Sequence, residues 1–191
     1  MSKKYRPAKI VTGVVRLLNA HIWEQADIPG YDGFYASTLL IPKEDDKTIL
    51  GINTAIDNAI ALGMAAHGGT RGRKPYVKLP LHDGDTDCLA PVFRGCHYLN
   101  AASLAAPQVF DHQLFPVTDT NAVGSGSWVR VSLTFFLIYE KGHSRMGCEL
   151  GNIQKARISD SYELLEDAGF ETFLDEYFRI FEKPRGTDKV P

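Results

Sequence analysis

The segment SWVRVSLTFFLIY, residues 127–139, alternates apolar residues with side chains that could do chemistry. Successive side chains of a β-strand point to opposite faces, so this segment predicts a strand with two different surfaces. We expect one face in the core: Val129, Val131, Leu133, Phe135, Leu137 and Tyr139. The other face carries Trp128, Arg130, Ser132, Thr134 and Phe136. An indole beside a guanidinium and hydroxyl groups is suited to stacking a nucleobase and holding a phosphate.

Two further segments combine aromatic and basic residues. In FRGCHYLNA, alternation places Arg94, Cys96, Tyr98 and Asn100 on one face, where Tyr98 could be a second stacking ring. TRGRKPYVK, residues 70–78, predicts a basic loop around one aromatic ring: Arg71, Arg73, Lys74, Tyr76 and Lys78. A packed tyrosine and a solvated surface loop are the alternative interpretations of these two segments.

The segment LHDGDTDC invites a metal interpretation because His82, Asp83, Asp85, Asp87 and Cys88 are close together. A calcium loop starting at Asp83 would need glycine at its sixth position and glutamate at its twelfth, and the chain has Cys88 and Arg94 there. We therefore expect a rigid Asp-Gly turn and no metal. A metal-dependent nuclease using Asp83, Asp85 and Asp87 remains the alternative. The chain has no nucleophile elbow, Walker loop or Rossmann glycine pattern, so we expect neither an enzyme nor a cofactor.

The overall composition predicts one cytoplasmic domain. The 191 residues are 44% hydrophobic, enough for one core with decorations. No run of about 18 apolar residues and no signal peptide is present, so we expect no membrane span and a cytoplasmic location. The three cysteines, Cys88, Cys96 and Cys148, have no disulfide or zinc spacing and are expected to be reduced.

Hydrophobic periodicity predicts a mainly β domain with added helices. We expect strands at residues 8–17, 34–42, 93–101, 127–139 and 148–158. We expect an amphipathic helix at 48–66 and C-terminal helices at 160–168 and 171–181. Five strands in one curled sheet with an inserted helix fit an OB-type barrel with helices packed outside.

Charge is unevenly distributed along a chain whose formal net charge is -2. The first 16 residues include Lys9 and Arg16 and have no acidic residue, whereas acidic residues dominate 159–182. We therefore divide the chain into an OB-fold domain at 1–158, an acidic helical extension at 159–182 and a disordered tail at 183–191.

Five segments, taken in order, resemble the OB-fold single-stranded-DNA-binding proteins of tailed phages, a family first defined as a domain of unknown function. They are TGVVR at 12–16, IPK at 41–43, LPLHDGD at 79–85, GCHYLNAAS at 95–103 and SGSWVRVSLTFF at 125–136. The last two are the most specific. Together the segments extend over most of the chain.

The resemblance implies sequence-independent binding of single-stranded DNA in phage DNA replication or recombination, without a catalytic centre. It places Lys43, Tyr98, Trp128 and Arg130 in the site. The family usually has a basic residue at the position of His82, and this chain lacks the acidic-aromatic tip seen at the C-terminus of many single-strand binders. Replication or recombination proteins are further expected partners, and a homo-oligomer is left open.

From the residues and the resemblance together, we expect cations to follow the phosphates and aromatic rings to stack on bases. The full set of expected DNA-binding residues is Lys9, Arg16, Tyr35, Lys43, Arg71, Arg73, Lys74, Tyr76, Lys78, Arg94, Tyr98, Trp128 and Arg130. A non-catalytic OB-fold module that binds another protein through Phe34, Tyr35 and the exposed aromatic residues is the third hypothesis.

Deleting residues from 160 onward separates two roles for the acidic extension. If its carboxylates compete with DNA for the basic surface, the shortened protein binds single-stranded DNA more tightly. If the extension is a helical cap on the barrel, the deletion lowers the melting temperature instead. Fluorescence anisotropy and thermal denaturation measure the two outcomes on the same sample.

Overall fold

The computed structural model describes residues 8–28, 30–66, 77–88, 90–140 and 143–156. Within this part, one long helix, α1 (Asp46–Ala66), and a short 3-10 helix, η1 (Pro91–Phe93), accompany the strands. The strands are β1 (Lys9–Val11), β2 (Val15–His21), β3 (Tyr35–Pro42), β4 (Val77–Lys78), β5 (His82–Asp83), β6 (Cys96–Ser103), β7 (Val109–Phe110), β8 (Trp128–Glu140) and β9 (His143–Lys155). The predicted C-terminal helices, the tail and the basic residues of the loop before β4 lie outside the described residues.

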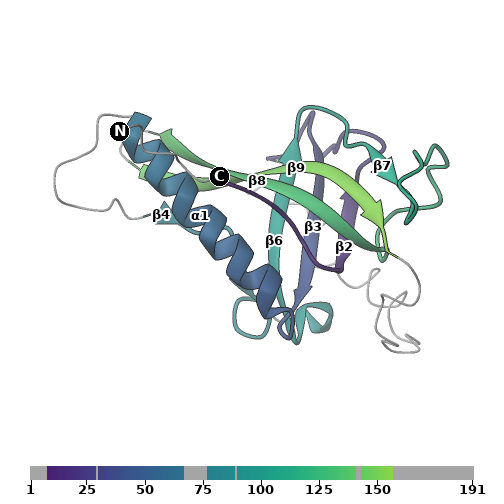
Figure 1. Ribbon diagram of the computed structural model, residues 1–191, viewed down its shortest axis with the longest axis horizontal. Coiled ribbons are helices and arrows are strands. Elements are labelled where there is room, and N and C mark those ends of the chain that lie inside the picture. Colours follow the sequence, from purple (N-terminus) through teal and green to yellow (C-terminus); the bar gives the residue numbers. More distant parts are fainter. Residues whose placement is uncertain (1–7, 29, 67–76, 89, 141–142, 157–191) are drawn as a thin grey trace, which may run out of the picture.

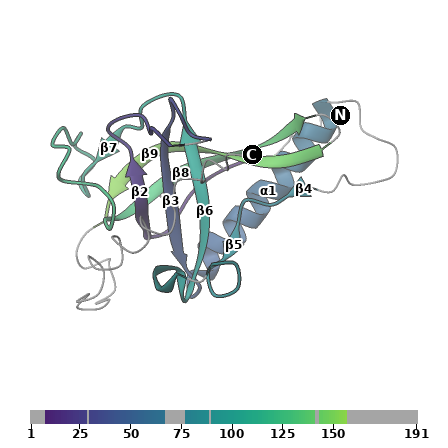
Figure 2. The ribbon, with the colours of Figure 1, turned by 180° about the vertical axis from the view of Figure 1, so that it is seen from behind.

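Five strands close into a ring in the order β8, β2, β3, β6, β9 and back to β8. Most neighbours in this ring are antiparallel, and the parallel contact of β6 with β9 at Ala102 and Glu149 completes it. Figure 1 shows β8 and β9 running along the molecule while β2, β3 and β6 stand side by side across one half of it. Figure 2 shows the same three strands from behind, with β5 beside the end of β6. The expected five-stranded architecture with an inserted helix is confirmed.

The inward faces of these strands form the main core. Leu17 lies opposite Leu39, and Leu39 lies opposite Leu99, and all three side chains are fully buried. Helix α1 adds Ile52 and Ile56 to the same core. The helix begins where the Asp45 carboxylate accepts a hydrogen bond from the Thr48 backbone N–H, at 3.0 Å. The predicted amphipathic helix is therefore confirmed, and it packs against β8 and β1.

The length and composition of α1 would also suit a membrane-spanning helix. A helix that packs one face on a protein core has a similar composition, and here Ile52, Ile56 and Ala59 are buried against the strands. We therefore interpret α1 as a core helix.

The prediction of one strand over residues 8–17 is wrong, because the chain breaks at Gly13. The Gly13 backbone N–H donates to Thr48 Oγ1 at 2.7 Å, and a Cβ at this position would collide with the side chains of Asp45 and Thr48. The close approach of α1 therefore separates β1 from β2.

Other strand boundaries also differ from the prediction. Phe93 belongs to η1, and β6 starts three residues later at Cys96. Strand β9 begins at His143 instead of Cys148, and the short strands β4, β5 and β7 were not predicted. Two-residue strands contain too few side chains to show an alternation pattern.

We expect Leu99→Ala to lower the free energy of unfolding by about 2 to 5 kcal/mol, because it opens a cavity in the closed core. Leu104→Ala is the matched control, since Leu104 is 71% exposed and its truncation should change stability by no more than about 0.5 kcal/mol. Urea denaturation measures both, and equal effects of the two variants would contradict this account of the core.

Candidate nucleic-acid interface

The alternation predicted for β8 is present in the structure. Val129, Val131 and Leu133 are fully buried in the main core, and Phe135 is nearly so. On the opposite face, Trp128 is half-buried. The indole therefore lies on the outside of the barrel, where a ligand can reach part of its surface.

A row of side chains begins at Trp128 on β8 and crosses the outer face over β2, β3, β6 and β5. Trp128 of β8 pairs with Arg16 of β2, and Arg16 pairs with Leu40 of β3. Leu40 in turn pairs with Tyr98 of β6, and Tyr98 pairs with His82 of β5. The fold thus brings three of the expected DNA-binding residues, from three separate segments, into one line on one surface.

Arg16 is held against the Trp128 ring. Its guanidinium carbon lies 5.6 Å from the ring centroid, which is within cation–π range. Its Nε donates to the Gly126 carbonyl oxygen at 3.2 Å, in the turn that precedes β8. Gly126 has a φ of 90°, a left-handed conformation that favours glycine. The GSGS turn therefore positions both the tryptophan and the cation beside it.

Tyr98 is packed more tightly than the sequence indicated. Its ring stacks on His82 with centroids 5.1 Å apart, and the Phe93 ring contacts it edge-on at 4.7 Å. Tyr98 also packs against a second small hydrophobic cluster on the outer face, which consists of Leu18, Leu40, Ala90 and Phe93. Sequence reasoning missed this cluster and the stacking role of His82, because the segment carrying Ala90 and Phe93 folds back over β2 and β3.

Lys43 lies between two carboxylates. Its Nζ is 2.6 Å from Asp83 Oδ1 and 2.6 Å from Asp85 Oδ2. These hydrogen bonds raise the pKa of Lys43 above its ordinary value and lower the pKa of both aspartates. Asp85 Oδ1 also accepts a hydrogen bond from the Gly95 backbone N–H at 2.9 Å. Lys43 therefore ties the turn after β5 to the end of β3, and its charge is engaged by carboxylates.

The same geometry bears on the metal hypothesis. Two of the three aspartates of the alternative nuclease site bind the ammonium group of Lys43, and Asp87 lies 3.4 Å from His82 Nδ1. Within the described ranges, no group of three His, Cys, Asp or Glu side chains is arranged to hold a metal ion.

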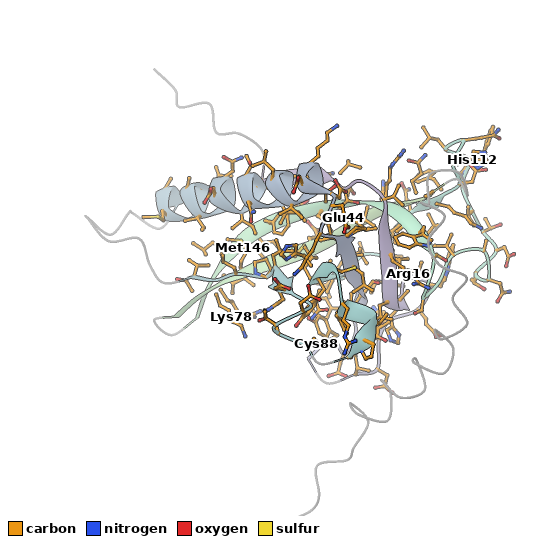
Figure 3. The ribbon with its side chains drawn as sticks, turned by 90° about the horizontal axis from the view of Figure 1, so that it is seen from below. Arg16, Glu44, Lys78, Cys88, His112 and Met146 are labelled. Carbon is orange, nitrogen blue, oxygen red and sulfur yellow. The ribbon has the colours of Figure 1, made fainter. Side chains whose placement is uncertain are left out.

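The remaining expected residues are spread over the fold. Lys9 and Lys78 are exposed on β1 and β4, Tyr35 is half-buried at the start of β3, and Arg94 is exposed directly after η1. Arg130 is exposed on β8, two residues beyond Trp128. Figure 3 shows Arg16 and Lys78 well apart along the molecule, so these cations belong to different parts of the surface. Four expected residues lie outside the described part of the chain: Arg71, Arg73, Lys74 and Tyr76.

A known protein family matches most of the chain. The family model described as "Enterobacter phage Enc34, ssDNA-binding protein" matches residues 8–165. The chain belongs to this family. The resemblance drawn from the five sequence segments is therefore confirmed. Among curated proteins, none matches the chain.

Solved structures show the same fold. The single-stranded DNA-binding protein from bacteriophage Enc34, in complex with ssDNA, is 23% identical with a TM-score of 0.62, covering 82% of this chain and 97% of that chain. A C-terminal truncation of the Enc34 protein gives 20% identity and a TM-score of 0.64, with 82% and 93% covered. The gp2.5 single-stranded DNA-binding protein of bacteriophage T7 gives 16% identity and a TM-score of 0.56, with 87% and 99% covered.

We expect Lys43→Gln to make the melting temperature depend less on pH in the acidic range. In the native protein, Lys43 lowers the pKa of Asp83 and Asp85. The two carboxylates therefore stabilise the folded state above the unfolded pKa of about 3.9, and this stabilisation is lost as the pH falls through their lower folded pKa values. Removing the ammonium group brings the folded pKa values back toward the unfolded ones. Melting temperatures of both proteins between about pH 2 and 7 measure the difference, and parallel profiles would contradict it.

Proposed function

We propose that this protein binds single-stranded DNA without sequence preference, in phage DNA replication or recombination, through the outer barrel face around Trp128. The observation that carries the proposal is the pair formed by Trp128 and Arg16 on that face, with the guanidinium 5.6 Å from the ring centroid. The family membership supports the same nucleic-acid class.

The chemistry of this pair accounts for the lack of sequence preference. Every base has a π-face, so stacking on an indole contributes about 1 to 3 kcal/mol per base whichever base is present. Arg16 and the exposed Arg130 supply positive charge for phosphates next to the stacked base. Neither contact reads the donor and acceptor pattern of a base edge.

The place of action follows from the ligand. A phage protein that binds single-stranded DNA works where the phage genome is copied, which is the cytoplasm of the host cell. The family description supports binding as the activity, and we propose no catalytic step. The proposed partners are single-stranded DNA and the replication or recombination proteins that act on it.

We expect Trp128→Ala to weaken binding of single-stranded DNA by roughly tenfold or more, because the variant loses one stacking platform. Fluorescence anisotropy with labelled single-stranded DNA, duplex DNA and RNA, each at two salt concentrations, measures the affinity and its salt dependence. The wild-type affinity should fall with salt by a slope of about 0.7 per phosphate contacted on a single strand.

Trp128→Phe is the control for this experiment, because phenylalanine keeps an aromatic face and should retain most of the affinity. An unchanged affinity in Trp128→Ala would remove Trp128 from the site. Absence of oligonucleotide binding at low salt would instead favour a protein-interaction module, and magnesium-dependent cleavage of the labelled strand would favour a nuclease.

A further inference from the structure

The β8–β9 hairpin extends beyond the barrel as an arm, formed by residues 134–138 of β8 and 144–149 of β9. Its inner face is covered by α1. Gly63 of the helix lies so close to Leu137 that a Cβ at residue 63 would be 2.7 Å from Leu137 Cβ, and Met146 and Cys148 are buried on the same side. The main core therefore continues under the arm, and α1 closes it (Figure 1).

The outer face of the arm presents an aromatic ring. Phe136 points away from the core and is 45% exposed. It pairs with Gly147 of β9, and a Cβ at residue 147 would come within 2.6 Å of two of its ring carbons. The ring therefore lies against the backbone of Gly147, and the glycine leaves room for it. Sequence alternation placed Phe136 on the outer face but gave no reason to include it in the site.

Exposed cations lie on the strands beside this ring, at register positions before and after it. Arg145 of β9 pairs with Ile138 on one side and with Lys78 of β4 on the other, so the two cations are neighbours on the outer face. At the barrel end of the arm, Lys9 of β1 pairs with Thr134, which also pairs with Glu149. On the described outer face of the arm and of its neighbouring strands β1 and β4, the exposed cations Lys9, Lys78 and Arg145 thus outnumber the exposed acid Glu149, although the chain as a whole is acidic.

The arm surface is continuous with the surface around Trp128. Trp128, Arg130, Ser132, Thr134 and Phe136 lie on the same face of one strand. Phe136 is eight positions along the strand from Trp128. At about 3.3 Å per residue, the two residues are up to about 26 Å apart. That length corresponds to at most about eight nucleotides at the duplex rise of 3.4 Å, and to fewer in an extended strand. It lies within the site sizes of about 4 to 16 nucleotides that single OB folds cover.

We propose that the outer face of the arm is a second contact region for the same DNA strand, with Phe136 as a stacking platform and Lys78 and Arg145 as phosphate contacts. The proposal rests on the function proposed above and extends its site from the barrel along β8. Figure 3 shows Lys78 away from α1, toward the arm end of the molecule, while Arg16 marks the barrel site.

Charge complementarity favours a polyanion over a protein as the occupant. Standard protein interfaces bury about 800 Å² per partner, and their cores are depleted of lysine and enriched in aromatic side chains. Here a single exposed ring stands between exposed cations, which is the pattern of a strand-tracking nucleic-acid surface.

Two oligonucleotide lengths test the proposal. A strand of about 4 nucleotides can occupy only one region, whereas one of about 16 nucleotides can reach both. Phe136→Ala should weaken binding of the long strand by roughly tenfold and leave the affinity for the short strand unchanged, because the short strand binds at Trp128. Trp128→Ala should weaken both. Phe136→Trp should retain long-strand affinity and report binding by fluorescence quenching.

Matched controls come from the opposite side of the arm. Leu50→Ala removes an apolar side chain of α1 that is 69% exposed, and it should leave both affinities unchanged. The double variant Lys78→Gln, Arg145→Gln should reduce the salt slope for the long strand by about 1.4, which is two phosphate contacts at about 0.7 each. Lys47→Gln on α1 should not change that slope.

The outcomes separate the two proposals. If Trp128→Ala weakens binding and Phe136→Ala binds the long strand as tightly as the wild type, the arm region is overturned and the barrel site stands. If the wild type binds neither strand at low salt, the proposed function itself fails. If Phe136→Ala abolishes self-association in sedimentation while long-strand affinity is unchanged, the face is a contact between copies of the chain.

Discussion

Strand β8 pairs with β2 along one edge and with β9 along the other, and this double pairing closes the ring. Because side chains alternate with a period of two, the register that buries Val129 and Val131 also puts Trp128 and Arg130 outside. A slip by one residue would bury a guanidinium and expose the core valines. Core packing therefore stabilises the same register that presents the indole, so the proposed binding surface needs no separate stabilisation.

Lys43 and Arg16 have different partners in the structure. Lys43 is held between Asp83 and Asp85, where the ammonium offsets carboxylates and fixes a turn. Arg16 contacts the Trp128 ring and donates to the Gly126 carbonyl oxygen. A cation held between two carboxylates attracts phosphate much less than an unpaired cation does. The ion pairs of Lys43 therefore stabilise the turn after β5, and they weaken the case for Lys43 as a phosphate contact.

The sequence was sufficient to predict the alternation of β8 and the helix after β3, because these depend on local periodicity in long elements. The five-stranded architecture was predicted from the number of expected strands and the inserted helix. It was insufficient for features that depend on distant segments. The break at Gly13 comes from contact with Asp45 and Thr48, and the ion pairs of Lys43 come from a turn 40 residues away. The segment SRMGCEL does alternate, but the expected strand began at Cys148, so Arg145 and Gly147 were overlooked.

The two aromatic side chains of the cross-strand row have different amounts of contact before any ligand arrives. Tyr98 is stacked on His82 and touched by Phe93, so a base must share a ring that already contributes to packing. Trp128 contacts Arg16, which the Gly126 carbonyl also holds, so ring and cation are positioned together. Side chains that are ordered in advance lose little conformational entropy on binding. We therefore propose Trp128 as the better anchor for an unpaired base, with Tyr98 supporting the surface around it.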